Sequence, residues 1–172
     1  MKTHIPFFSL LLLTVTLMFA GNCGNNEAYE WYLRAQVKIV TPTSEDSFNF
    51  DEPCYLFTGE IDDETYWEID AIDRSVPFGI YIGWKESFVT SPGTFQAERG
   101  FQTLYIWLMR AHPSEPGWYR YSEIDEGSVT FTQVGYQSGD IIDGSFDQLY
   151  LYDFDAETNI EVNNGTFRCR VE

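Results

Sequence analysis

Basic side chains are scarce in this chain. Its 172 residues include 10 Lys and Arg against 27 Asp and Glu, which gives a formal net charge of −17. Proteins that bind nucleic acid gather Lys and Arg into a patch that contacts phosphates, whereas the basic residues here are scattered. The composition therefore argues against nucleic acid and against anionic lipid headgroups as partners. It suits cationic partners or divalent metal, although a solvated acidic surface is the simpler interpretation.

Histidine is the next scarcity. Of the two in the chain, His4 precedes the long apolar run described below, which leaves His112 beside Pro113 in a predicted loop. A zinc site needs three or four ligands, and a Ser-His-Asp triad would have to use His112 without a Gly-x-Ser-x-Gly turn to carry its serine. Phosphate-loop and dinucleotide motifs are also missing. We expect no enzymatic activity; a hydrolase with two carboxylates is the weaker alternative.

Long apolar runs are limited to one, Ile5–Ala20, which follows Lys2. Its 16 residues are fewer than the roughly 20 that a membrane-spanning helix needs. A short basic start, a short apolar segment and small residues after it are typical of a secretory signal. We therefore predict a signal peptide over residues 1–22.

Cys23 follows the small residues directly, and this resembles the lipobox of bacterial lipoproteins, in which that cysteine carries lipid. A typical box has Leu and then Gly or Ala where this chain has Ala20 and Asn22. The alternative is an ordinary signal that leaves Cys23 as a thiol. Lipidation would anchor the protein through acyl chains. Gly24 stands where an inner-membrane retention Asp would be, which suggests the outer membrane.

Cysteine is also sparse, and its odd count fits the anchor. If Cys23 of the three cysteines carries lipid, Cys54 and Cys169 remain as a pair in an oxidising compartment. Each lies in an alternating segment, so both thiols are expected to face the core. We predict a disulfide between them; the alternative is two buried thiols that pack as small hydrophobes.

Removal of residues 1–22 leaves 150 residues, a normal single-domain length. Residues 23–31 are polar and are predicted to form a tether, and 32–172 form the domain. Short segments rich in β-branched and aromatic residues alternate there with turn clusters, which predicts an all-β, antiparallel β-sandwich. Residues 46–52 are expected to form at most one short helical turn. The predicted strands lie near 33–40, 54–61, 65–73, 78–84, 103–111, 117–122, 127–134, 145–153 and 166–171.

Two of these strands show the pattern best. In 66–71 the residues Trp67, Ile69 and Ala71 share one face, and the acids between them share the other. In 103–109 both faces are apolar, which is typical of a strand covered on both sides. The pattern places Trp67 and Trp107 in the core.

The C-terminal half carries three motifs, Gly127–Thr132, Gly139–Phe146 and Asn163–Phe167. In these it resembles a group of bacterial lipoproteins of unknown function with a Gly-x-Val-Thr-x-Thr strand, a Gly-x-x-x-x-Gly-x-Phe strand and a final Asn-Gly-x-Phe hairpin. Ser91–Phe95 is similar to a turn often found upstream. The resemblance covers about half the mature chain. It implies an extracytoplasmic β-sandwich whose glycines mark turns or bulges, and it implies no catalytic residues.

Aromatic residues are plentiful, with eleven Tyr and five Trp. Exposed aromatic rings on a β-sandwich can stack on sugars, and Trp118, Tyr119 and Trp84 are the candidates for such ligand binding because they lie in or near predicted loops. The alternative is that these rings pack in the core, where each buries 150–250 Å².

Acidic turns supply the only metal candidates. Asp62, Asp63 and Glu64 lie in a predicted hairpin and Asp70 on the strand that follows. Calcium takes six to eight oxygen ligands, but no EF-hand spacing is present, and solvated turns explain the acids equally well. We expect no cofactor, with calcium as the alternative.

These observations predict an exported, lipid-anchored envelope lipoprotein that acts as a structural or interaction module. A carbohydrate-binding module is the alternative, and a calcium-binding surface protein or a hydrolase is weaker. The expected partners are the membrane, reached through the anchor, and an envelope protein or glycan.

Overall fold

The computed structural model describes residues 30–75, 78–100, 103–111, 119–153 and 158–172. The predicted signal peptide, Cys23 and Trp118 lie outside these ranges, as does most of the predicted tether. Strands make up the regular structure of the described residues. In chain order they are β1 (Tyr32–Val40), β2 (Glu45–Ile61), β3 (Glu64–Asp73), β4 (Phe78–Lys85), β5 (Gly93–Gln96), β6 (Leu104–Ala111), β7 (Tyr119–Gln133), β8 (Ile141–Asp153) and β9 (Thr158–Arg170).

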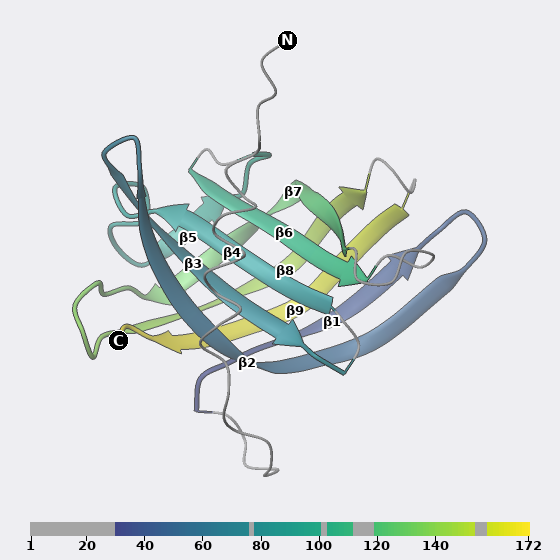
Figure 1. Cartoon of the computed structure of the whole chain (residues 1–172), viewed down its shortest axis with the longest axis horizontal. Coiled ribbons are helices and arrows are strands. Elements are labelled where there is room, and N and C mark those ends of the chain that lie inside the picture. Colours follow the sequence, from purple (N-terminus) through teal and green to yellow (C-terminus); the bar gives the residue numbers. More distant parts are fainter. Residues whose placement is uncertain (1–29, 76–77, 101–102, 112–118, 154–157) are drawn as a thin grey trace.

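The strands form one antiparallel sheet that closes on itself (Figure 1). The order is β5-β7-β6-β4-β3-β2-β1-β9-β8, and β8 also pairs with β7. Eight strands therefore make a closed barrel, and the four-residue β5 pairs with Ser128–Phe131 of β7, beyond the residues of β7 that pair with β6. Closure gives the eight strands of the ring a neighbour on each side, which removes the edges that an open sheet exposes.

The prediction of an all-β, antiparallel domain is confirmed, but two separate sheets are not formed. A sandwich and a barrel share the same alternation along each strand, and they differ in whether the first and last strands of the sheet meet. Here β7 and β8 meet over Glu123–Gln133, with three register shifts that bend the pair. No helix in the described part of the chain is long and apolar enough to cross a membrane.

Apolar side chains fill the inside of the barrel. Alternate residues of each strand point inward, as Trp67, Ile69 and Ala71 do on β3, and this confirms the predicted face. Trp84 and Phe167 are fully buried and both contact the ring of Phe131, at centroid distances of 5.1 and 5.6 Å. The interior is thus a packed core of interlocking aromatic and aliphatic side chains.

Three local predictions were wrong because distant pairing overrides local signals. Residues 46–52, which were expected to form at most one short helical turn, are extended in β2, where all of them pair with β1. The predicted strands 117–122 and 127–134 are one strand, β7, which continues through Gly127. Gly127 has φ +152°, and a Cβ there would lie 2.6 Å from the side chain of Leu149, so glycine is required at this bend. Residues 93–96 form the unpredicted β5.

The fourth error concerns Asn164-Gly165, a dipeptide typical of tight hairpin turns and part of the final hairpin motif noted in the sequence. Both residues lie inside β9, which runs unbroken from Thr158 to Arg170. Arg34 of β1 pairs with Thr166 and Gln36 pairs with Asn163, so two residues of β9 face one residue of β1. This is a β-bulge, which uses the same positive-φ residue types as a tight turn.

Cys54 and Cys169 are joined by a disulfide, with their Cα atoms 6.2 Å apart. They lie on β2 and β9, the two neighbours of β1, just beyond the point where Tyr32 begins that strand. Both are buried, as the alternation predicted. The bond therefore bridges the gap that β1 leaves between its neighbours.

Candidate functional site

A second cluster, made of buried and half-buried residues with an exposed border, lies on the outside of the barrel. The outward side chains of β3, β4, β6 and the start of β7 include four tyrosines, a tryptophan, a methionine and three acids, and we call this surface the aromatic face. Tyr66, Tyr105 and Met109 on it are buried although they point away from the core. Its members are Tyr66, Glu68, Asp70, Tyr81, Tyr105, Trp107, Met109, Tyr121 and Glu123.

Strand register aligns aromatic and acidic residues across this surface. Tyr55 pairs with Asp70, Asp70 with Tyr81, Tyr81 with Trp107, and Trp107 with Glu123. The five residues come from five adjacent strands, β2, β3, β4, β6 and β7, which lie side by side in Figure 1. Since neighbouring strands are about 4.8 Å apart, the row spans roughly 19 Å.

Gly83 makes room for an aromatic ring in the neighbouring row of paired residues. It lies between Glu68 of β3 and Tyr105 of β6. A Cβ at Gly83 would lie 2.0 Å from the Cζ atom of Tyr105, so the tyrosine ring rests on the glycine backbone. Across it, the Tyr105 hydroxyl donates a hydrogen bond to Glu68 Oε2 at 3.0 Å.

Glu68 and Asp70 share this environment, and their pKa values are coupled. Burial raises the pKa of Asp70 to about 9, and the neighbouring charge of Glu68 adds to the shift. Burial also raises the pKa of Glu68, while the hydrogen bonds from Tyr105 and Asp70 lower it. The pKa of Tyr105 is raised by burial and by Glu68. The raised pKa of Asp70 therefore favours its protonated form at neutral pH.

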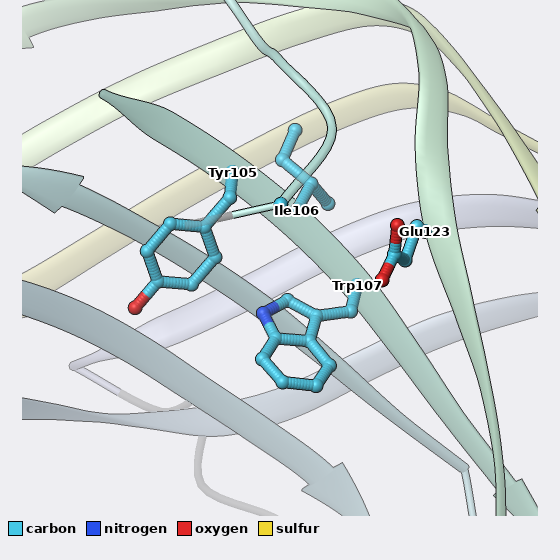
Figure 2. Close-up of a pocket in the computed structure, with 5 residues that line it drawn as sticks. Tyr105, Ile106, Trp107 and Glu123 are labelled. Atoms are coloured by element: carbon cyan, nitrogen blue, oxygen red, sulfur yellow. The ribbon is translucent and has the colours of Figure 1, made fainter. Parts of the chain in front are cut away.

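Trp107 lies at the centre of the face between two tyrosines. Its ring is 6.2 Å from Tyr105 at an interplanar angle of 66° and 5.7 Å from Tyr121 at 64°. Figure 2 shows Tyr105 and Trp107 projecting from the same side of β6, with Glu123 beside Trp107. The recess that they line with Gly100 and Ile106 has a volume of about 10 Å³, room for about one water molecule.

Comparisons with models of protein families, with curated proteins and with solved structures found no match.

Of the three predicted ligand-binding aromatics, the structure places the side chain of Trp84, and it is not part of this surface. Trp84 is fully buried, and its indole N–H donates to the Tyr136 hydroxyl at 3.0 Å, so it packs in the core and cannot contact a ligand. Tyr119 begins β7, opposite Ala111, and Trp118 lies outside the described residues. Trp107, which the apolar pattern placed in the core, lies instead on the aromatic face and is half-buried.

The calcium candidates are spread along one hairpin. Asp62 and Asp63 form the exposed turn between β2 and β3, both with positive φ, and Glu64 accepts a hydrogen bond from the Ser87 hydroxyl at 2.8 Å. Asp70 lies six residues further along β3, roughly 20 Å away. Within the described residues no three His, Cys, Asp or Glu side chains are placed to hold a metal ion.

The alternation in 66–71 predicts that Glu68 and Asp70 share one face, opposite the core, and this is confirmed. Tyr105, Trp107 and Tyr121 were missed as members of the same surface. The doubly apolar strand at 103–109 was the signal that could have found them, because a strand with apolar residues on both sides needs a cover on the outside as well as inside.

Proposed function

We propose that this protein is an exported, lipid-anchored interaction module without catalytic activity, and that the aromatic face is its docking surface for an envelope protein with basic groups. The observation that carries the proposal is the row of three aromatic and two acidic residues that register aligns across five strands. Tyr, Trp and Met are the residue types enriched at protein interfaces.

Exposure and charge support a basic partner. Tyr121 at the border of the face is 42% exposed and Tyr55 is 45% exposed. Glu123 is exposed beside Trp107. Aromatic rings and carboxylates both attract Lys and Arg side chains. The net charge of −17 would draw a basic partner over a longer range.

Ring geometry favours a protein over a sugar on this surface. A sugar-binding platform presents aromatic rings that are coplanar, whereas the rings beside Trp107 are tilted from it by 64° and 66°. Tilted rings offer pockets and edges into which side chains can insert. Because β3, β4 and β6, which carry most of this face, each have a paired strand on both sides, we expect the partner to dock through side chains rather than to add as a further strand.

Site-specific crosslinking tests the docking surface. The full chain carries p-benzoylphenylalanine in place of Tyr121, or in place of Asn159 as a control on the exposed outer side of β9. In the cells that make the protein, we expect one discrete protein adduct from position 121 and none from position 159. Binding of the purified adduct partner should weaken by at least about tenfold on Trp107→Ala and at high salt. Identical adducts from both positions would contradict the docking surface.

The anchor has a separate test. The mature N-terminus should begin at Cys23 with the mass of added acyl chains, and Cys23→Ser should release the protein from membrane extracts. An unmodified residue 23 would refute lipidation and leave the docking surface unaffected.

A further inference from the structure

The bulge in β9 places two asparagines on the outer side of the barrel. Side chains of a regular strand alternate, yet Asn163 and Asn164 both point outward while Gly165 points in, against the ring of Phe146. Asn164 has φ +52°, a left-handed conformation that non-glycine residues seldom adopt. Bulges commonly re-aim side chains beside functional sites. Here the effect is to add a second amide to the outer face.

Further amides lie next to this pair. Gln36 of β1 pairs with Asn49 of β2 on one side and with Asn163 on the other. Asn164 donates from Nδ2 to Gln36 Oε1 at 3.2 Å, which orients the Gln36 amide. Four amide side chains from three adjacent strands therefore meet on one outer surface.

A hollow lies over these amides, and we call it the amide hollow. Its volume is about 330 Å³, within the range of small-ligand sites. The three amides Gln36, Asn49 and Asn163 line it together with Val37, Lys38, Ser47 and Phe48. It lies over β2, β1 and β9, whereas the aromatic face lies on β3, β4, β6 and β7. The two surfaces share no residue, and β2 is the one strand that contributes both to the hollow and, through Tyr55, to the aromatic row.

The lining is close to neutral in a strongly acidic protein. Lys38 contributes the one charge, and its ammonium is 3.3 Å from a carboxylate oxygen of Glu45. Each amide presents two N–H donors and a carbonyl acceptor. Hydroxyl groups also donate and accept, so amides match a ligand rich in hydroxyls. An ionic ligand would find no net opposite charge among these residues.

We propose that the amide hollow is a hydrogen-bonding site for an uncharged carbohydrate chain. The length of the row of amide side chains favours an oligosaccharide over a single sugar. Gln148 of β8 pairs with Asn163 and continues the amide row to a fourth strand, so the row from Asn49 to Gln148 spans roughly 14 Å. The site does not depend on the aromatic face or on the lipid anchor.

A panel of neutral oligosaccharides tests the site. Cellohexaose, maltohexaose, mannohexaose and chitohexaose are titrated into the full chain by calorimetry and by ligand-observed NMR, with glucose and polygalacturonate as the short and anionic controls. We expect saturable binding of at least one hexasaccharide, weaker binding of glucose and none of polygalacturonate. Absence of binding to all four neutral probes would overturn the proposal.

Matched variants locate the binding. Asn49→Ala and Asn163→Ala should each weaken the affinity roughly threefold to tenfold, the range for one or two lost neutral hydrogen bonds. Asn159→Ala removes an exposed asparagine from the outer side of the same strand and should leave the affinity unchanged. Asn164→Gly keeps the positive φ and removes the amide, so it separates loss of the ligand contact from loss of the bulge. Equal losses in Asn159→Ala and Asn163→Ala, or unchanged affinity in Asn163→Ala, would place binding elsewhere and refute the site.

Discussion

Asp70→Asn should change how the stability of the protein depends on pH. The pKa of Asp70 is about 9 in the folded chain and about 3.9 in an unfolded one. Between these values the folded chain holds a proton that the unfolded chain releases. Stability contributed by this proton is therefore full below about pH 4 and is lost as pH rises toward 9. Asparagine cannot titrate, and its amide can still donate to Glu68.

The magnitude follows from one proton. A single bound proton gives a slope of at most about 1.4 kcal/mol per pH unit, and three units, from pH 5 to pH 8, give a ceiling of about 4 kcal/mol. The coupling within the pair and relaxation of its surroundings reduce this value. We therefore expect the unfolding free energy of Asp70→Asn, relative to that of wild type, to rise by at least about 1 kcal/mol between pH 5 and pH 8. Urea denaturation followed by Trp fluorescence at each pH measures the unfolding free energy.

The control is Asp147→Asn, which removes one charge from an exposed position on β8. It corrects for the general relief of repulsion in an acidic protein. If the unfolding free energies of Asp70→Asn, Asp147→Asn and wild type depend on pH in the same way between pH 5 and pH 8, Asp70 is ionised in the folded protein. The interpretation that Asp70 holds a proton on the aromatic face then fails.

Two further predictions concern the fold. Replacing Cys54 and Cys169 by Ser should cost about 4–5 kcal/mol, because the bond closes a loop of 115 residues, and calorimetry should show melting roughly 10–20 °C lower; an unchanged melting temperature would contradict the bond. Gly83→Ala should destabilise by about 1–3 kcal/mol, because its Cβ would meet the tyrosine ring that rests on the glycine. Gly59→Ala, whose Cβ meets nothing within 4 Å, is the matched control in urea unfolding and should change stability by less than about 0.5 kcal/mol; equal effects of the two would refute the packing.

Alternation along single strands was sufficient to predict much of the fold. The faces of Trp67 and Glu68 and the inward placement of Cys54 and Cys169 follow from a period of two residues. Each depends on neighbours within the same strand. The disulfide could be predicted for the same reason, because two cysteines that both point into one small core are expected to lie close together.

The errors share a different cause, which is that pairing between distant strands decides the outcome. Asn164-Gly165 has turn chemistry, but β1 and β8 pair on either side of it and hold the chain extended through a bulge. The aromatic face depends on register across β3, β4 and β6, which aligns Glu68 with Tyr105 although they are 37 residues apart. Spacing within one strand carries no information about that register.

The disulfide also has a mechanical consequence for a protein held by its N-terminus. If the chain is anchored at Cys23 as proposed, any pull between membrane and partner enters the barrel at Tyr32, the first residue of β1. Force along β1 loads the hydrogen bonds to β2 and β9 together, because these bonds lie perpendicular to the strand. Cys54 and Cys169 tie those two neighbours together beside the point of entry. The strand that bears the load therefore lies between two others that cannot be drawn apart there.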